Sequence, residues 1–347
     1  MTLNSAPVIK RKKEKPAWMS WVRPYQTPEI SKSVRQIITT FVPFFTLWIL
    51  MYYSLRVSYV LTLLLAIVEA GFVVRMFIIQ HDCGHGSYFK ERKWNDRVGF
   101  ISGLFTLVPY YHWRKMHAIH HANAGKLEDT RGIGDFYTWT VDEYLARSKK
   151  AQLGYRIYRN PIFLICVLPF IAFVIAYRIP FKMTKEKGWK KERYNVYWTN
   201  LGIAIVTVFF ISLFGFKEYL LIQIPIVYLA TTIGAWFFFV QHQFEDAYWA
   251  KEEEWDYASA ALQGSSYYKL PKVLQWFTGN IGFHHIHHLS PKIPNYKLQA
   301  CHEENPELQD VHVLTLRSSF DTLDLALFDE ENKKMISFRE LKKRQAA

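Results

Sequence analysis

Long uncharged stretches alternate along this chain with short segments that are rich in lysine and arginine. Four of the stretches are long enough to cross a bilayer: residues 36–55, 57–80, 197–216 and 219–241. A helix of about 20 apolar residues spans the roughly 30 Å hydrocarbon core of a membrane. The pattern therefore predicts an all-α integral membrane protein with four transmembrane helices arranged in two hairpins.

Two further apolar runs, residues 99–111 and 161–177, raise the question of additional spans. The first run has only 13 residues, which is too few to cross. The second carries Pro169 at its middle, where a proline removes a backbone hydrogen bond and kinks a helix. We therefore expect both runs to be re-entrant or interfacial, while six spans stay open as the alternative if both cross.

Charge sets the expected orientation. The chain carries a net charge of +13, and its basic residues flank the apolar runs, so a membrane surface is a better partner than nucleic acid. Residues 1–35, the loop after the second span and residues 178–193 are all basic, and such segments stay in the cytoplasm. We expect a cytoplasmic N-terminal segment, 1–35, before a single membrane domain, 36–347, in the plasma membrane, with both termini cytoplasmic.

Nine of the 13 histidines fall into clusters with the spacing of metal ligands. On a helix, positions i, i+3 and i+4 share one face, so the imidazoles within each cluster can point the same way. The three cysteines are scattered and form neither a disulfide framework nor a CxxC site. The candidate ligands are His81, His85, His117, His120, His121, His242, His284, His287 and His288.

These histidines follow spans that end on the same side of the membrane, so they can converge in a cytoplasmic helical cap. Nine imidazoles exceed what one ion can use, and two metal ions are the economical interpretation. Imidazole suits zinc, copper and iron. A site facing a membrane indicates a lipid acyl chain as substrate, and attack on an unactivated methylene requires oxygen chemistry, which favours iron.

Three of these clusters resemble the three boxes of the membrane histidine-box fatty acid desaturases, in order and spacing. The matching segments are His81–His85, His117–His121 and Gly279–Pro291. Residues 241–245 and 291–296 are most similar to the bacterial acyl-lipid branch, the Bacillus-type Δ5 and the Δ12 enzymes. The resemblance covers nearly the whole chain.

The resemblance implies a di-iron enzyme that uses O₂ and two electrons to desaturate acyl chains esterified in membrane phospholipids. Ferredoxin or flavodoxin would be the electron donor, because this chain has no cytochrome b5-like part. In acyl-CoA relatives, an asparagine four residues before the equivalent of His242 helps to hold metal through water. Phe238 takes that place here, and Asn280, four residues before His284, is a candidate substitute.

Several other polar residues receive expectations of their own. Asp82 and Glu245 are candidate carboxylates that accept the free N–H of a ligating imidazole. Glu69 should face the protein interior, and Arg75 should reach the cytoplasmic headgroups. Residues 178–193 anchor the topology, and docking of an acidic electron-transfer protein is a further candidate role. The histidines left outside the ligand set are His112, His285, His302 and His312.

Two other functions compete with desaturation. Histidine-box hydroxylases, acetylenases and carotenoid oxygenases share much of the site, and the boxes do not separate them from desaturases. A non-enzymatic metal transporter or sensor is the other class. A transporter places its ligands near the middle of the bilayer, whereas these histidines lie at the ends of spans and beyond. The double-bond position, the headgroup preference and the oligomeric state are not encoded in these motifs.

Overall fold

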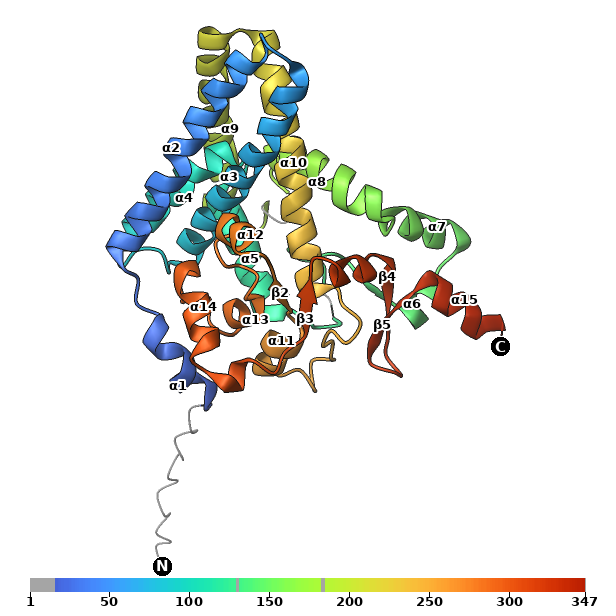
Figure 1. Cartoon of the computed structure of the whole chain (residues 1–347). Coiled ribbons are helices and arrows are strands. Elements are labelled where there is room, and N and C mark those ends of the chain that lie inside the picture. The colour runs from blue at the N-terminus through green and yellow to red at the C-terminus, as the bar shows by residue number, and fades with distance from the viewer. Residues whose placement is uncertain (1–15, 129–130, 182–184, 347) are drawn as a thin grey trace, which may run out of the picture.

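The structure is a computed structural model that describes residues 16–128, 131–181 and 185–346. Residues 1–15, which hold much of the predicted basic N-terminal segment, and Lys182 lie outside the described residues. Helices make up most of the described chain. Figure 1 shows a tall bundle of long helices that stands on a broader cap of short helices and strands.

Four helices are long and apolar enough to cross a membrane: α2 (Ile30–Ser54), α3 (Tyr59–His85), α9 (Lys190–Phe214) and α10 (Phe216–His242). The prediction of four spans in two hairpins is confirmed. Residues 55–58 join α2 to α3, and Gly215 alone joins α9 to α10. Its φ of +97° lies in the region that favours glycine. α3 runs five residues past the predicted apolar stretch and so carries the first histidine pair.

The two shorter apolar runs form broken helices. Residues 99–111 cover the end of α4 (Arg92–Phe105) and the start of α5 (Tyr110–Asn123), each with 14 residues. Residues 161–177 contain a π-helical turn, Phe163–Val167, followed by α8 (Leu168–Val174) and the 3₁₀ turn Ala176–Arg178. This segment bends by 60° from α7 (Lys149–Tyr158). Counting the bent pair as one span gives five at most, so the described residues do not supply six.

The cap is built from short elements that pack beneath the long helices. Its helices are α1 (Trp18–Val22), α6 (Val141–Ala146), α11 (Tyr257–Gln263), α12 (Lys272–Phe277), α13 (His284–Leu289), α14 (Asn295–Glu303) and α15 (Phe338–Ala346). Short 3₁₀ turns occupy Arg23–Tyr25, Pro306–Leu308 and Ser318–Asp324.

Two small sheets, which the sequence did not predict, tie the C-terminal part of the chain to the rest of the cap. β4 (Leu325–Asp329) pairs in parallel with β1 (Trp139–Thr140) and antiparallel with β5 (Lys334–Ser337), while β2 (Tyr267–Lys269) pairs in parallel with β3 (Val313–Thr315). Strands of two to five residues are too short to show a clear alternation of polar and apolar positions.

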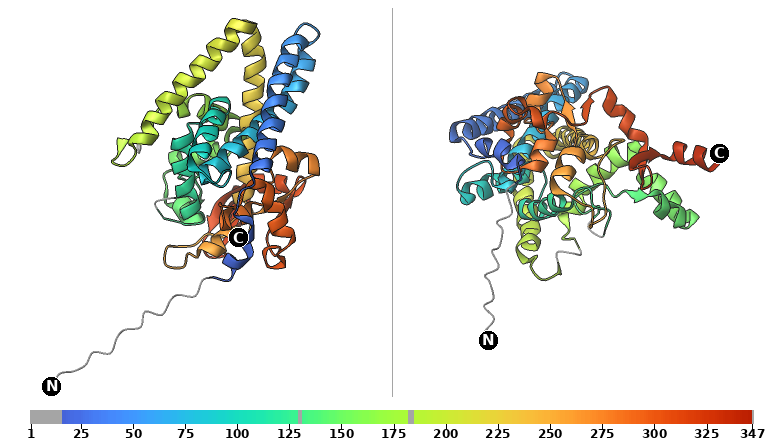
Figure 2. Two further views of the ribbon diagram at one scale, coloured as in Figure 1. Left: turned by 90° about the vertical axis from the view of Figure 1, so that its left-hand side faces the viewer. Right: turned by 90° about the horizontal axis from the view of Figure 1, so that it is seen from below.

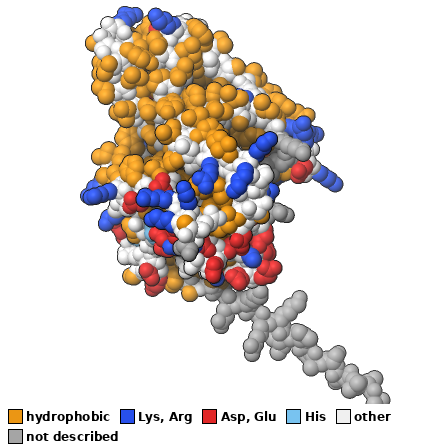
Figure 3. All heavy atoms as spheres, turned by 90° about the vertical axis from the view of Figure 1, so that its right-hand side faces the viewer, with side chains coloured by type: hydrophobic (Ala, Val, Ile, Leu, Met, Phe, Trp, Pro, Cys, Tyr) orange, Lys and Arg blue, Asp and Glu red, His pale blue; other side chains and the backbone are white. Residues whose placement is uncertain are grey.

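The long helices expose a continuous apolar surface. Ile205 and Val208 on α9 are 62% and 65% exposed, and Ile38 and Leu50 on α2 are also exposed. Below a tip that carries a few basic side chains, the upper part of the molecule is covered by hydrophobic side chains, and most charged residues of this face lie lower down (Figure 3). An apolar surface of this extent is expected where protein meets lipid.

α3 stands at the centre of the bundle, packed against α2, α4 and α10. Glu69 on α3 is fully buried, as predicted. The expectation for Arg75 is wrong, because its guanidinium does not extend to the headgroups. It lies 3.9 Å over the ring of Trp276, donates to that residue's carbonyl and is covered by α12. A buried guanidinium can be stabilised within the protein by a cation–π contact with an aromatic ring and by a hydrogen bond to a carbonyl.

Candidate metal centre

Four separate elements bring the predicted histidines to one place. The C-terminal turn of α3 contributes two, α5 contributes three, the last residue of α10 contributes one, and the short helix α13 contributes three. α13 directly follows a loop in which Asn280 has a φ of +60°. All nine predicted ligands meet in a single cluster: His81, His85, His117, His120, His121, His242, His284, His287 and His288.

The cluster divides into two groups of ring nitrogens. In each, one nitrogen per residue lies within 4.8 Å of all the others: His81, His85, His117, His121 and His287 in one group, and His120, His242 and His288 in the second. His284 joins the second group, since its Nε2 lies 2.9 Å from Nε2 of His242. In the first group, Nε2 of His121 lies 3.0 Å from Nε2 of both His117 and His287. The first group thus holds five imidazoles and the second holds four.

Burial favours the form of histidine that binds metal. Removal from water, together with the neighbouring imidazoles, holds the pKa of six of these side chains well below the usual range: His117, His120, His121, His284, His287 and His288. A neutral imidazole offers a lone pair. Four ring nitrogens, Nε2 of His85 and His288 and Nδ1 of His121 and His284, are buried without a hydrogen-bond partner. A buried polar atom without a partner destabilises the fold unless a ligand binds it. One metal ion bound by Nε2 of His85 and another bound by Nε2 of His288 would supply the missing partners for these two nitrogens.

Asp82 lies where a carboxylate can orient a ligand. Its Oδ1 is 3.1 Å from Nδ1 of His81, so an Nδ1–H tautomer donates to it and leaves Nε2 for the metal. Its Oδ2 accepts from the backbone N–H and the side-chain amide of Asn295, at 2.6 and 2.8 Å. Asn295 in turn exchanges hydrogen bonds with Gln36 on α2. Sequence reasoning missed Asn295, although it lies in the segment 291–296 that carried the resemblance.

Asp135 is a second carboxylate at the cluster, and no motif pointed to it. Its Oδ2 lies 3.8 Å from Nδ1 of His120, and burial raises its pKa to about 7. The backbone carbonyl of Gly264 lies 3.3 Å from Nδ1 of His242. Nδ1 of His242 therefore has a backbone carbonyl within hydrogen-bond distance, and Nδ1 of His120 has a carboxylate nearby. Such acceptors can fix the orientation of a ligating imidazole.

The other two supporting candidates do not reach the histidines. Glu245 is 57% exposed at its side chain and pairs with Lys334 at 3.2 Å, because the chain has left α10 and turned to the surface. Asn280 accepts from Gln275 and donates to the carbonyl of Asn295, both outside the cluster. Phe238, at the position of the missing asparagine, packs its ring 5.2 Å from His120 and 5.1 Å from His242.

The four histidines left out of the ligand set lie outside the cluster. His112 is buried among the rings of Tyr177, Phe181 and Trp189. His285 pairs with His302 at 3.3 Å between ring nitrogens. His312 stacks on Phe244.

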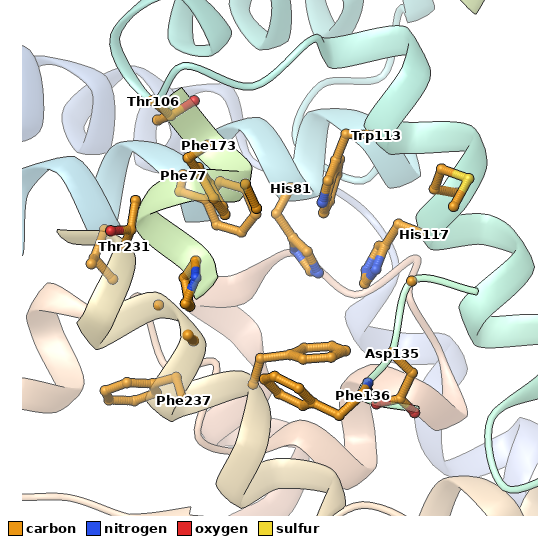
Figure 4. Close-up of a pocket in the computed structure, with 18 of the residues that line it drawn as sticks. Phe77, His81, Thr106, Trp113, His117, Asp135, Phe136, Phe173, Thr231 and Phe237 are labelled. Carbon is orange, nitrogen blue, oxygen red and sulfur yellow. Dashed lines mark hydrogen bonds between the residues drawn. The ribbon is translucent and has the colours of Figure 1, made fainter. Parts of the chain in front are cut away.

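A cavity of about 460 Å³ opens onto the cluster, a size typical of small-molecule sites. Its walls are mostly apolar and come from α3, α5, α8 and α10, and they include His81, His117 and His284. Figure 4 shows the rings of His81 and His117 side by side, next to Trp113 and opposite Phe136 and Asp135. Trp113 stacks on His117 with ring centres 4.5 Å apart. The cavity can hold a long apolar ligand against the first group of histidines.

Comparison with known proteins agrees with this geometry. The sequence profile described as "Fatty acid desaturase" matches residues 54–320. A "Fatty acid desaturase" of Bacillus subtilis is 48% identical over 321 residues, which cover 92% of this chain and 90% of the relative. An "sn-1 oleoyl-lipid 12-desaturase" of Synechocystis is 26% identical, covering 65% of this chain and 63% of its own. An "sn-1 acyl-lipid omega-3 desaturase (ferredoxin)" of Nostoc is 27% identical, covering 66% and 62%. The chain belongs to the fatty acid desaturase family and is an oxidoreductase that acts on fatty acids.

Proposed function

We propose that this protein is a di-iron, O₂-dependent desaturase that introduces a double bond into acyl chains of membrane phospholipids. The observation that carries the proposal is the apolar cavity, whose wall includes histidines of both groups: His81 and His117 from the first and His284 from the second. An acyl chain in this cavity would lie against the metal centre.

The nine clustered histidines would hold the metals, five around one ion and four around the other. Two iron ions would supply the activation of O₂ that removal of one hydrogen from each of two neighbouring methylene carbons requires. The buried carboxylate of Asp82 would keep the His81 tautomer fixed, with Asn295 holding that carboxylate in place.

The rest of the cavity would position the substrate. Phe77, Trp113, Phe237 and Phe238 form apolar walls beside the histidines. Such walls exclude water and hold one pair of carbons close to the centre, which is the protein's main share in a reaction that a cofactor drives.

The electron donor and the orientation complete the proposal. The name of the Nostoc relative specifies ferredoxin, and that of an Arabidopsis relative specifies cytochrome b5. We assign ferredoxin or flavodoxin to this protein. The metal centre and both termini would face the cytoplasm and the protein would lie in the plasma membrane, in line with the basic segments next to the cap.

The test is gas chromatography–mass spectrometry of membrane fatty acids from a bacterium that makes only saturated chains. Three strains would express the wild-type protein, the His120→Ala variant and the matched His312→Ala variant. We expect new monounsaturated chains in the first and third strains and none in the second. Fragmentation of double-bond adducts would then give the carbons that are attacked.

Two outcomes would contradict the proposal. Hydroxylated chains would place the enzyme among the hydroxylases while keeping the metal centre. An unchanged lipid profile, with oxygen and reductant shown to be present, would favour another substrate or a metal-handling role.

A further inference from the structure

His85 differs from the other eight clustered histidines in its exposure to solvent. The other eight residues are buried, whereas His85, taken as a whole residue, is partly exposed. Its Nε2 still points inward and is buried without a hydrogen-bond partner. Among the nine histidines, His85 is therefore the residue that solvent reaches most.

Two arginines lie directly beside the backbone of His85. Arg92 Nη2 donates to the carbonyl of Gly84 at 3.4 Å, and a Cβ placed on Gly86 would lie 2.9 Å from Arg92 Nη1. A Cβ on Gly84 would lie 3.7 Å from Cγ of Arg114. Both guanidiniums bind one oxygen of Asp96, at 3.0 and 2.9 Å. One carboxylate shared between two arginines leaves a net positive charge at the edge of the centre.

The positive charge continues across α5 to the start of α9. The Nζ atom of Lys191 lies 3.8 Å from the ring centre of Tyr111, and Nζ of Lys115 lies 3.9 Å from that of Trp189. α4, α5 and the start of α9 lie together in Figure 2 (left), in keeping with their mutual packing. We call this surface the basic face; its cations are Arg92, Arg114, Lys115, Lys187, Lys190 and Lys191. The carboxylates among them are Asp96, which is shared, the buried Glu192 and the exposed Glu186.

Two small side chains of the basic face lie on the helix that also carries three of the clustered histidines. Ala118 and Ala122 are exposed on α5, one and two turns after Arg114 on the same side of the helix. His117 and His121, which directly precede these two alanines in the sequence, are buried. A protein that rests on these two alanines would lie directly against the helix that carries three of the clustered histidines.

We infer that the basic face is the docking surface for a small acidic one-electron carrier protein, which passes electrons to the metal centre by way of His85. The inference rests on the proposed function. Each turnover consumes O₂, two electrons and two protons from outside together with two hydrogens of the acyl chain. It yields one carbon–carbon double bond and two molecules of water. Two successive encounters with a one-electron carrier supply the electrons, and opposite charge steers such encounters.

The test measures KM for the carrier with the purified enzyme in nanodiscs, using a reduced acidic [2Fe–2S] ferredoxin and, in a second arm, a reduced flavodoxin. The variant is K187E/K190E/K191E, whose residues are exposed and lie at or just before the N-terminus of α9, where acidic residues are well tolerated. The matched control is R339E/K342E/K343E on α15, with the same change in charge. A dithionite-reduced small viologen serves as a reductant that needs no docking.

We expect the α9 variant to raise KM for the carrier on the order of tenfold while kcat at saturation and the viologen-driven rate stay unchanged. Raised salt should increase KM of the wild type more than that of the variant. Ala118→Trp should lower the carrier-driven rate alone. The control should behave as the wild type does.

Three results would overturn the inference. An unchanged KM, or an equal rise in the control, would exclude the basic face as the docking surface. A change confined to nanodiscs with anionic lipid, with KM for the carrier unchanged, would assign the face to lipid headgroups instead. If the wild type makes no product even with the viologen, the proposed function fails and the docking inference fails with it.

Discussion

Two of the spans, α3 and α9, look alike in sequence and differ sharply in the fold. Both are long apolar helices, with 27 and 25 residues. In the most apolar 18-residue stretch of α3, 61% of the residues are buried, against 11% in α9. α3 packs on three neighbours and ends in His81 and His85, whereas α9 turns most of its surface outward. Hydropathy thus identifies a span without saying whether it faces lipid or the protein interior.

The polar residues within the two helices account for the difference. α3 contains Glu69, Arg75, His81 and Asp82, all buried, while the middle of α9 carries apolar side chains that stand in the lipid-facing surface. Ionisable groups in a membrane are expensive unless protein surrounds them, so they force their helix to the centre of the bundle. The comparison predicts that changes in α3 should be far more damaging than changes in α9.

The largest effect is expected from removing a ligand on α3. His81→Ala should lower desaturation by more than about 100-fold, because replacing a residue that only supports a ligand already costs up to about that much. His312→Ala, which removes a histidine outside the cluster, should keep activity and metal content. Fatty acid analysis and metal content of the purified variants check this. Full activity in His81→Ala would separate α3 from the metal centre.

Asp82→Asn should have the next largest effect. An amide keeps the size of the carboxylate but weakens its hold on Nδ1 of His81 and on Asn295, so we expect a loss of roughly 10–100-fold in activity or metal affinity. Glu245→Gln should change neither, since Glu245 pairs with Lys334 at the surface. Metal retention under a chelator series distinguishes the two variants. Equal effects would contradict the assignment of Asp82 as the supporting carboxylate.

Filling the cavity from α10 should affect the substrate and not the fold. Gly234 lines the cavity, and a Cβ there would meet no atom within 4 Å. Gly234→Ala should be tolerated and should stabilise α10 by up to about 1 kcal/mol. Gly234→Phe should lower turnover on long acyl chains by on the order of tenfold, below the roughly 100-fold that a 1 Å misplacement in a site can cost. Turnover assays with chains of different length test this, and equal turnover in both variants would show that the acyl chain lies elsewhere.

The smallest effect is expected on the lipid-facing side of α9, and it sharpens the comparison. Met76→Ala on α3 removes a fully buried side chain and should cost about 2–5 kcal/mol of stability. Val208→Ala on α9, where the valine is 65% exposed, should change stability by less than about 0.5 kcal/mol. Thermal unfolding in one detergent compares the two. Similar shifts in Tm would mean that α3 and α9 are equally embedded in the bundle.

Local patterns in the sequence sufficed to predict the spans and the convergence of the nine histidines. The spans follow from runs of apolar residues, and the histidines follow from helical spacing next to span ends. Asn295 was missed because its role depends on a contact with Asp82, 213 positions away. Asp135 was missed because it lies in the irregular segment after α5, where no helical spacing relates it to His120. Glu245 was predicted beside an imidazole because it follows His242 closely, yet the chain turns away after α10. Proximity in sequence misleads where a helix ends.

The most direct test of the central claim is to count iron in anaerobically purified protein and to follow one exposure to O₂. Mass spectrometry of metals with Mössbauer spectroscopy would give the number and the coupling of the ions. We predict about two coupled irons per chain, as two groups of imidazoles require, and new double bonds in bound phospholipid after reduction and oxygen. A single iron, or zinc with no double bond formed, would contradict the di-iron account.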